Sequence, residues 1–206
     1  MAQRTMVGKF GLLILAVGCA AAPRLDPPGA PPVPSPPGVP PAPAPPSAPQ
    51  APPPAPVLPA APWSGARLSV AAVPSVFVDE WRKAENRATC APVAPANLGA
   101  GAGASPRRAN FGGGWAVAYD RPGLRSAFGV AGTGSRASDP AYDAWPHRRA
   151  WADGSSAGYG PEGGTGPNEL AYLRIQGQGC LYNVWSRLGR AHLEQLLESL
   201  RFVAVP

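Results

Sequence analysis

The residues best suited to recognising a ligand lie in the segment 142–151, where aromatic rings alternate with cations. The members of this candidate ligand-binding set are Tyr142, Trp145, Arg148, Arg149 and Trp151. Aromatic faces stack on sugar rings or bases, and guanidinium groups bind carboxylate or phosphate. The segment therefore suits a glycan or an anionic polymer as ligand. The alternative is that Trp145 and Trp151 pack this segment onto the domain core.

Residues 154–158 match the pattern G-x-S-x-G, in which the central serine, here Ser156, is the nucleophile of a hydrolase. His192 and Glu169 are available as base and acid. The motif needs a strand before the serine and a helix after it, whereas this stretch is so rich in glycine that we expect a loop. We therefore expect no catalytic residue and a non-enzymatic protein. A small serine hydrolase using Ser156 is the alternative.

Neither a metal nor a cofactor is expected. The two histidines, His147 and His192, lie far apart in the sequence and lack the spacing of metal ligands. The glycine-rich stretch 99–103 looks like part of a phosphate-binding loop, but no strand is predicted before it and no Gly-Lys-Ser/Thr follows it. A linker is the better interpretation of that stretch.

The net charge of +6 over 206 residues raises the question of a nucleic-acid partner. The cations are almost all arginine, and arginine, alanine, glycine and proline dominate the chain, as codon bias in a GC-rich genome produces. No basic stripe recurs at helical spacing. We expect no nucleic acid as partner, and an anionic polymer of the cell envelope fits the modest charge better.

Cys19 ends a segment with the layout of a secretory signal. Arg4 and Lys9 precede a short apolar run from Phe10 to Val17, and small residues surround the cysteine. The run is far shorter than the roughly 20 apolar residues that span a bilayer. A cysteine at this cleavage position resembles the lipobox of bacterial lipoproteins. The alternatives are an ordinary signal cut after Ala22 and an uncut anchor.

The lipobox resemblance implies that a signal peptide, residues 1–18, is removed and that lipid, palmitate included, is attached to Cys19. The protein would then be held at the membrane, because several acyl chains together give firm anchoring. Ala20 stands where enterobacterial lipoproteins retained in the inner membrane carry aspartate. The resemblance therefore implies the cell envelope, with the outer membrane favoured over the inner one and the domain on the periplasmic or surface side.

Cys90 and Cys180 remain as a pair if Cys19 carries lipid. Exported proteins fold in an oxidising compartment, so we expect a disulfide bond between these two residues. The bond would close a loop of about 90 residues and stabilise the fold by about 4–5 kcal/mol on a chain-entropy model. The alternative is two buried thiols in a reduced protein.

Residues 19–62 are too rich in proline to build a hydrophobic core. Proline fixes φ and removes backbone donors, so this segment favours the polyproline II conformation, which advances about 3.1 Å per residue. We expect a disordered linker that holds the domain off a membrane. The alternative is a ligand for a receptor of proline-rich peptides.

Residues 63–206 are predicted to form a single α+β domain. The predicted elements are a helix opening at 74–75, a hairpin of strands 115–119 and 124–130, an irregular stretch 132–167, a hairpin of strands 170–175 and 180–185, a helix with leucines at 193, 196, 197 and 200, and a terminal strand 202–205. We expect an antiparallel sheet of two hairpins packed by an N-terminal and a C-terminal helix. The final helix and strand resemble the ending of PsbP-like domains, which implies a fold of that kind and no function.

Taken together, these features predict a lipid-anchored cell-envelope protein with a non-enzymatic binding or structural domain. Its expected partners are the membrane, through the N-terminal lipid, and peptidoglycan, lipopolysaccharide or another envelope protein. An accessory subunit of an envelope protein complex is a further alternative.

Overall fold

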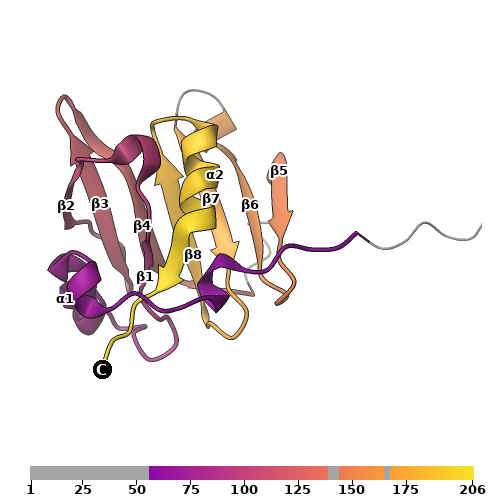
Figure 1. Ribbon diagram of the computed structural model, residues 1–206, viewed down its shortest axis with the longest axis horizontal. Helices are drawn as coiled ribbons and strands as arrows, with labels where there is room; N and C mark the ends of the chain where they lie inside the picture. The colour runs from indigo at the N-terminus through magenta and orange to yellow at the C-terminus, as the bar shows by residue number, and fades with distance from the viewer. Residues whose placement is uncertain (1–55, 139–143, 165–167) are drawn as a thin grey trace, which may run out of the picture. The chain divides into compact units, whose positions relative to one another are not determined.

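A seven-stranded antiparallel sheet dominates the computed structural model, which describes residues 56–138, 144–164 and 168–206. The strand order is β2-β3-β4-β8-β7-β6-β5 (Figure 1). The strands are β2 Ser105–Arg108, β3 Trp115–Arg121, β4 Leu124–Arg136, β5 His147–Ala150, β6 Ser156–Pro161, β7 Glu169–Arg174 and β8 Cys180–Ser186. Cys19, Tyr142 and most of the proline-rich segment lie outside the described residues.

Two helices and a second, two-stranded sheet complete the α+β fold. The helices are α1 Ser75–Lys83 and α2 Arg190–Ser199, and strand β1 Val93–Pro95 pairs with β9 Leu200–Phe202. The short 3-10 helices are η1 Pro62–Ser64, η2 Val70–Ala72, η3 Gly99–Gly101 and η5 Glu162–Gly164. None of the helices in these described ranges is long and apolar enough to cross a membrane.

The α+β class and the antiparallel sheet agree with the sequence prediction, but the sheet is larger than two hairpins. The predicted hairpins are present as β3-β4 and β7-β8, and they join through β4 and β8. Strands β2, β5 and β6 were missed, because they lie in stretches whose glycine, serine and proline content favours loops. β6 reads Ser-Ala-Gly-Tyr-Gly-Pro and is held as a strand by pairing with β5 on one side and β7 on the other.

The first helix begins where the sequence predicts and is short. It begins at Ser75, and Pro74 at the N-cap position provides no capping hydrogen bond from a side chain. It ends at Lys83 because Ala84 adopts an extended conformation. The Trp81 side chain contacts the loop that follows the helix, and its indole Nε1 donates a hydrogen bond of 3.2 Å to the Cys90 carbonyl.

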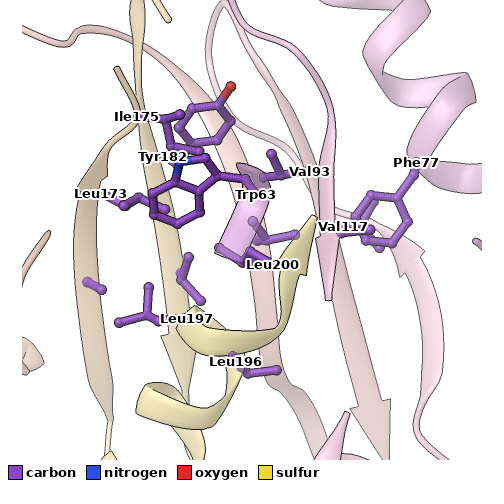
Figure 2. Packing of buried hydrophobic residues seen from close by; sticks show 14 of the residues in the cluster. Trp63, Phe77, Val93, Val117, Leu173, Ile175, Tyr182, Leu196, Leu197 and Leu200 are labelled. Carbon is purple, nitrogen blue, oxygen red and sulfur yellow. The ribbon is translucent and has the colours of Figure 1, made fainter. Parts of the chain in front are cut away.

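Both helices lie on the same face of the large sheet, which we call the covered face. The Phe77 ring of α1 extends toward β3 (Figure 2), with its centroid 6.3 Å from that of Tyr119. Tyr119 stacks on Phe128 at 4.6 Å, and Phe128 meets His192 of α2 edge-on at 4.9 Å. This continuous series of rings joins α1 to α2 across β3 and β4. In Figure 1, α2 crosses in front of β7 and β8.

A disulfide bond between Cys90 and Cys180 is present, as expected, with the Cα atoms 5.4 Å apart. It joins the loop after α1 to the first residue of β8 on the covered face. Gly132 of β4 faces it, and a Cβ at that position would lie 2.4 Å from Cys90 Sγ and 2.5 Å from Trp115 Nε1. The fold therefore requires glycine at position 132.

The chain from Pro59 to Trp63 packs against the turn between β5 and β6. Trp63 is buried and meets Trp151 edge-on, with the ring centroids 4.8 Å apart. Its indole Nε1 donates a 2.9 Å hydrogen bond to Asp153 Oδ2, and the Ala152 N–H donates to the Pro59 carbonyl at 2.9 Å. This arm is thus fixed to the fold before the first helix begins.

Candidate ligand-binding face

The opposite face of the seven-stranded sheet carries no α-helix among the described residues, and we call it the open face. Strand alternation places Ala116 and Ala118 there, because Trp115 and Tyr119 contact α1 on the covered face. One row of paired residues crosses the open face from β3 to β5: Ala116, Ala131, Asn183, Tyr172, Gly158 and Arg148. Small residues at one end of the row thus give way to an amide, a ring and a cation.

A cavity of ≈ 270 Å³ lies at the β5–β8 end of the open face, and we call it the arginine cavity. It exists because the neighbouring residues Ala150, Ser156 and Gly158 have short side chains or none. Longer side chains border the space they leave, and these belong to Arg148, Tyr172, Arg174 and Leu181. The cavity therefore combines an aromatic ring with guanidinium groups.

Aromatic packing extends the arginine cavity toward β6. The Tyr172 ring lies 5.5 Å from that of Trp145 at an interplanar angle of 43°. Trp145 is half-buried over Gly160, where an added Cβ would lie 3.5 Å from Trp145 Cε3 and 2.5 Å from Pro146 Cγ. Arg174 is oriented by a 2.5 Å hydrogen bond from its Nε to the Ala137 carbonyl.

The structure divides the five residues predicted to form the binding set. Arg148 and Trp145 lie on the open face, but Arg149 is the next residue of β5 and its guanidinium pairs with Glu198 of α2 on the covered face. Trp151 is only 1 % exposed and packs in the core against Trp63. Trp151 therefore does not offer its ring to a ligand in this structure, and it packs in the core as the alternative interpretation of the segment expected.

Sequence reasoning missed Tyr172 and Arg174, which complete the arginine cavity. Both lie on the alternating strand 170–175 that the sequence predicts, and Leu170, Tyr172 and Arg174 form one face of it. An aromatic and a cation on the same face of a strand, two residues apart, were the signal. The partner strand that brings Arg148 beside them was not predicted, so the cluster could not be assembled from the sequence.

Further hollows of ≈ 360 Å³ and ≈ 460 Å³ lie farther along the open face, and both are lined by Phe111, Tyr172 and Asn183. Phe111 stacks on Trp185 with the ring centroids 6.2 Å apart and an interplanar angle of 24°. Trp185 lies over Gly129, where a Cβ would come within 2.2 Å of Trp185 Cζ2. Glycine at position 129 therefore lets the indole lie close to the sheet.

The residues of the hydrolase alternative do not form a nucleophile elbow. Ser156 is the first residue of β6 on the open face, and a strand rather than a helix follows it. His192 is on α2, on the covered face, where Ser186 Oγ lies 2.8 Å from its Nδ1 and the Leu98 carbonyl 3.0 Å from its Nε2. A carbonyl only accepts, so Nε2 carries the proton and Nδ1 accepts from Ser186. Burial lowers the pKa of His192 and favours this neutral form.

The buried Ser186–His192 pair is accordingly a structural link between β8, α2 and the segment before η3. Ser186 is fully buried, and its Oγ also accepts a 3.0 Å hydrogen bond from the Leu188 N–H. Within the described ranges, no group of His, Cys, Asp and Glu side chains is placed to hold a metal ion.

No protein-family model, no curated protein and no solved structure matches this chain.

Proposed function

We propose that this chain is an exported, lipid-anchored protein of the cell envelope and that its folded domain is a non-enzymatic binding module for an acidic envelope glycan. Lipid on Cys19 would hold the protein at the membrane, with the outer membrane favoured, and the proline-rich segment would act as the spacer. Peptidoglycan and lipopolysaccharide both combine sugar rings with negative charge, and they are the ligands to test first.

The arginine cavity is the observation that supports this proposal. An acidic sugar presents an apolar C–H face and a carboxylate or phosphate, and the cavity brings the Tyr172 ring together with the guanidinium groups of Arg148 and Arg174. Guanidinium is suited to this task because its planar fork matches both anions and is always charged.

The size of the cavity limits what it can hold. Pockets for small organic ligands usually measure about 300–1,000 Å³. At ≈ 270 Å³ the arginine cavity is slightly below this range. It would therefore hold a single charged sugar unit, and the rest of a polymer would lie along the open face.

The binding experiment compares retention on purified peptidoglycan and on lipopolysaccharide. Arg148→Gln should reduce retention about tenfold or more, because it removes a charge-assisted contact worth about 1.5–3 kcal/mol. The matched control is Arg82→Gln, since Arg82 is exposed on α1 away from the open face. Retention of the wild-type protein should also weaken at high salt. Equal retention of Arg148→Gln and wild type, with both folded, would reject the arginine cavity as the site.

The anchoring experiment is mass spectrometry of the protein purified from its native membrane. The expected mature chain begins at Cys19 and carries acyl mass. Replacing Cys19 with serine should release the protein into the soluble fraction, because the thiol that receives lipid is then missing. A native mature form that starts at Pro23 without acyl mass would reject the lipid anchor and leave the binding experiment unaffected.

A further inference from the structure

Asn183 is a buried amide in the middle of the open face without a hydrogen-bond partner. It is 7 % exposed, lies between Ala131 and Tyr172 in the row of paired residues, and its Oδ1 has no partner. Leaving such a group unpaired costs about 1–3 kcal/mol. A buried amide in a central strand therefore needs a reason, and a ligand is one.

Two of the hollows on the open face include this amide in their lining. Asn183, Tyr172 and Phe111 line both the ≈ 360 Å³ and the ≈ 460 Å³ hollow. Because the terminal torsion of asparagine is broad and roughly two-fold, the amide can present either its oxygen or its nitrogen to them. The polar group without a partner is thus placed where a ligand has room to bind.

The ≈ 360 Å³ hollow also collects unpaired acceptors. Two further residues that line it, Asn168 and Glu169, each carry a buried side-chain oxygen without a hydrogen-bond partner, Oδ1 and Oε2 respectively. Acceptor oxygens require donors, so the complementary ligand is rich in N–H and O–H groups. The stacked rings of Phe111 and Trp185 line the same hollow and offer an apolar surface.

We propose that the hollow around Asn183 is a subsite for a neutral sugar unit that carries an acetamido group. The acetamido N–H would donate to Oδ1 and its carbonyl would accept from Nδ2, so that one group satisfies both atoms of the amide. Ring hydroxyls would donate to Asn168, and the C–H face of the sugar would pack on Phe111 and Trp185. This inference rests on the proposed glycan-binding function and names the sugar chemistry that the open face selects.

Tyr172 connects this subsite to the arginine cavity, because its side chain lines all three hollows. A glycan with an acidic unit at Arg148 would therefore place a neighbouring unit near Asn183. The two subsites differ in chemistry, since one offers cations and the other offers acceptors, and they can be probed separately.

The test measures binding of two uncharged trisaccharides by titration calorimetry. Tri-N-acetylchitotriose carries acetamido groups, and cellotriose has hydroxyls in their place. We expect the wild-type protein to bind the acetamido trimer at least about tenfold more tightly, the effect of roughly one or two hydrogen bonds. Asn183→Leu should remove this preference, while Arg148→Gln should retain it. Thermal unfolding of each variant checks that it is folded.

Each outcome separates this inference from the proposed function. No preference for the acetamido trimer in the wild type, or an unchanged preference in Asn183→Leu, overturns the subsite whatever the retention on acidic glycan. Binding of Ca²⁺ or of a primary amine at this hollow in place of the sugar also overturns it. Loss of acidic-glycan retention in Arg148→Gln, measured separately, decides the arginine cavity alone.

Discussion

The two faces of the seven-stranded sheet are built from the same strands but carry different residues. On the covered face, large rings and leucines fill the space beneath α1 and α2, and Phe77, Phe128 and Leu197 are fully buried. On the open face, β3 and β4 carry small residues such as Ala116, Gly129 and Ala131. The larger side chains of this face lie on the strands from β8 to β5. The covered face is filled by helices and their side chains, whereas the open face contains hollows that the described residues do not fill.

This difference shows that burial alone does not identify a structural residue. Asn183 and His192 are both almost fully buried, but His192 has a partner for each ring nitrogen and Asn183 has none. The covered side also has buried polar atoms without a partner, Trp115 Nε1 and Trp151 Nε1. What sets Asn183 apart is that hollows adjoin it.

The largest difference between the faces should appear in stability. Phe77→Ala removes a fully buried ring between α1 and β3 and should lower the free energy of unfolding by about 3–5 kcal/mol. Leu170→Ala on the open face removes a half-buried side chain and should cost about 1 kcal/mol. Denaturant titration of both variants measures this, and equal losses would break the distinction.

The disulfide should rank next, because it crosslinks the loop after α1 to β8 on the covered face. Replacing Cys90 and Cys180 together with serine should cost about 2–5 kcal/mol, since the crosslink restricts the unfolded chain. The measurement is the free energy of unfolding by denaturant, with and without reductant for the wild type. The variant should still bind glycan wherever it remains folded, and binding lost in a folded variant would contradict the separation of the faces.

A smaller effect is expected at Asp153, which holds the N-terminal arm beside β5. Partial burial raises the pKa of this carboxyl, but hydrogen bonds from the Ser155 N–H, the Trp63 indole and the Ser155 hydroxyl outweigh it and lower the pKa. A lowered native pKa adds stability above the usual carboxyl pKa, and this stability is lost as the pH falls through the native value. Asp153→Asn should reduce stability at neutral pH by about 0.5 kcal/mol, because the carboxylate is exposed and solvent screens its contacts.

The pH profile checks this assignment. The difference in denaturation midpoint between Asp153→Asn and wild type should shrink as the pH falls below about 4, the ordinary range of a carboxyl group. A difference that is constant between neutral and acidic pH would show that the ionised carboxylate is not what stabilises the arm.

The smallest change in stability is expected at Asn183. Leucine is close in size to asparagine, and it removes an amide that is buried without a partner. The free energy of unfolding of Asn183→Leu should be unchanged or higher by up to about 1 kcal/mol. A loss of 2 kcal/mol or more, about the cost of a broken buried contact, would show that the amide supports the fold.

The covered face could largely be predicted from the sequence, and the open face could not. Leucines at helical spacing indicated α2, large residues at alternate positions indicated β3, and elimination of Cys19 indicated the disulfide. These signals are local or depend on residue type. The strands β5 and β6 have weak β propensity and exist through pairing with distant partners, so no local pattern indicated them.

The candidate site was therefore predicted only in part. Arg148 and Arg149 are equivalent in the sequence, but once β5 is a strand they must point to opposite faces. The sequence left open whether Trp151 binds a ligand or packs on the core, because its partner, Trp63, lies 88 residues earlier in the chain. The sequence did not indicate Asn183 as a site residue, since the role of an asparagine in a strand depends on the residues that surround it in the fold.

The attachment of the N-terminal arm to the β5–β6 turn has a mechanical consequence. Any tension that reaches the chain ahead of Pro59 enters the fold through Trp63 and passes to Trp151, directly after the edge strand β5. β5 is paired with a single neighbour over four residues, so it is the first strand that such a force can peel away. Arg148 is part of that strand, and a ligand held by it would share the load between anchor and sheet.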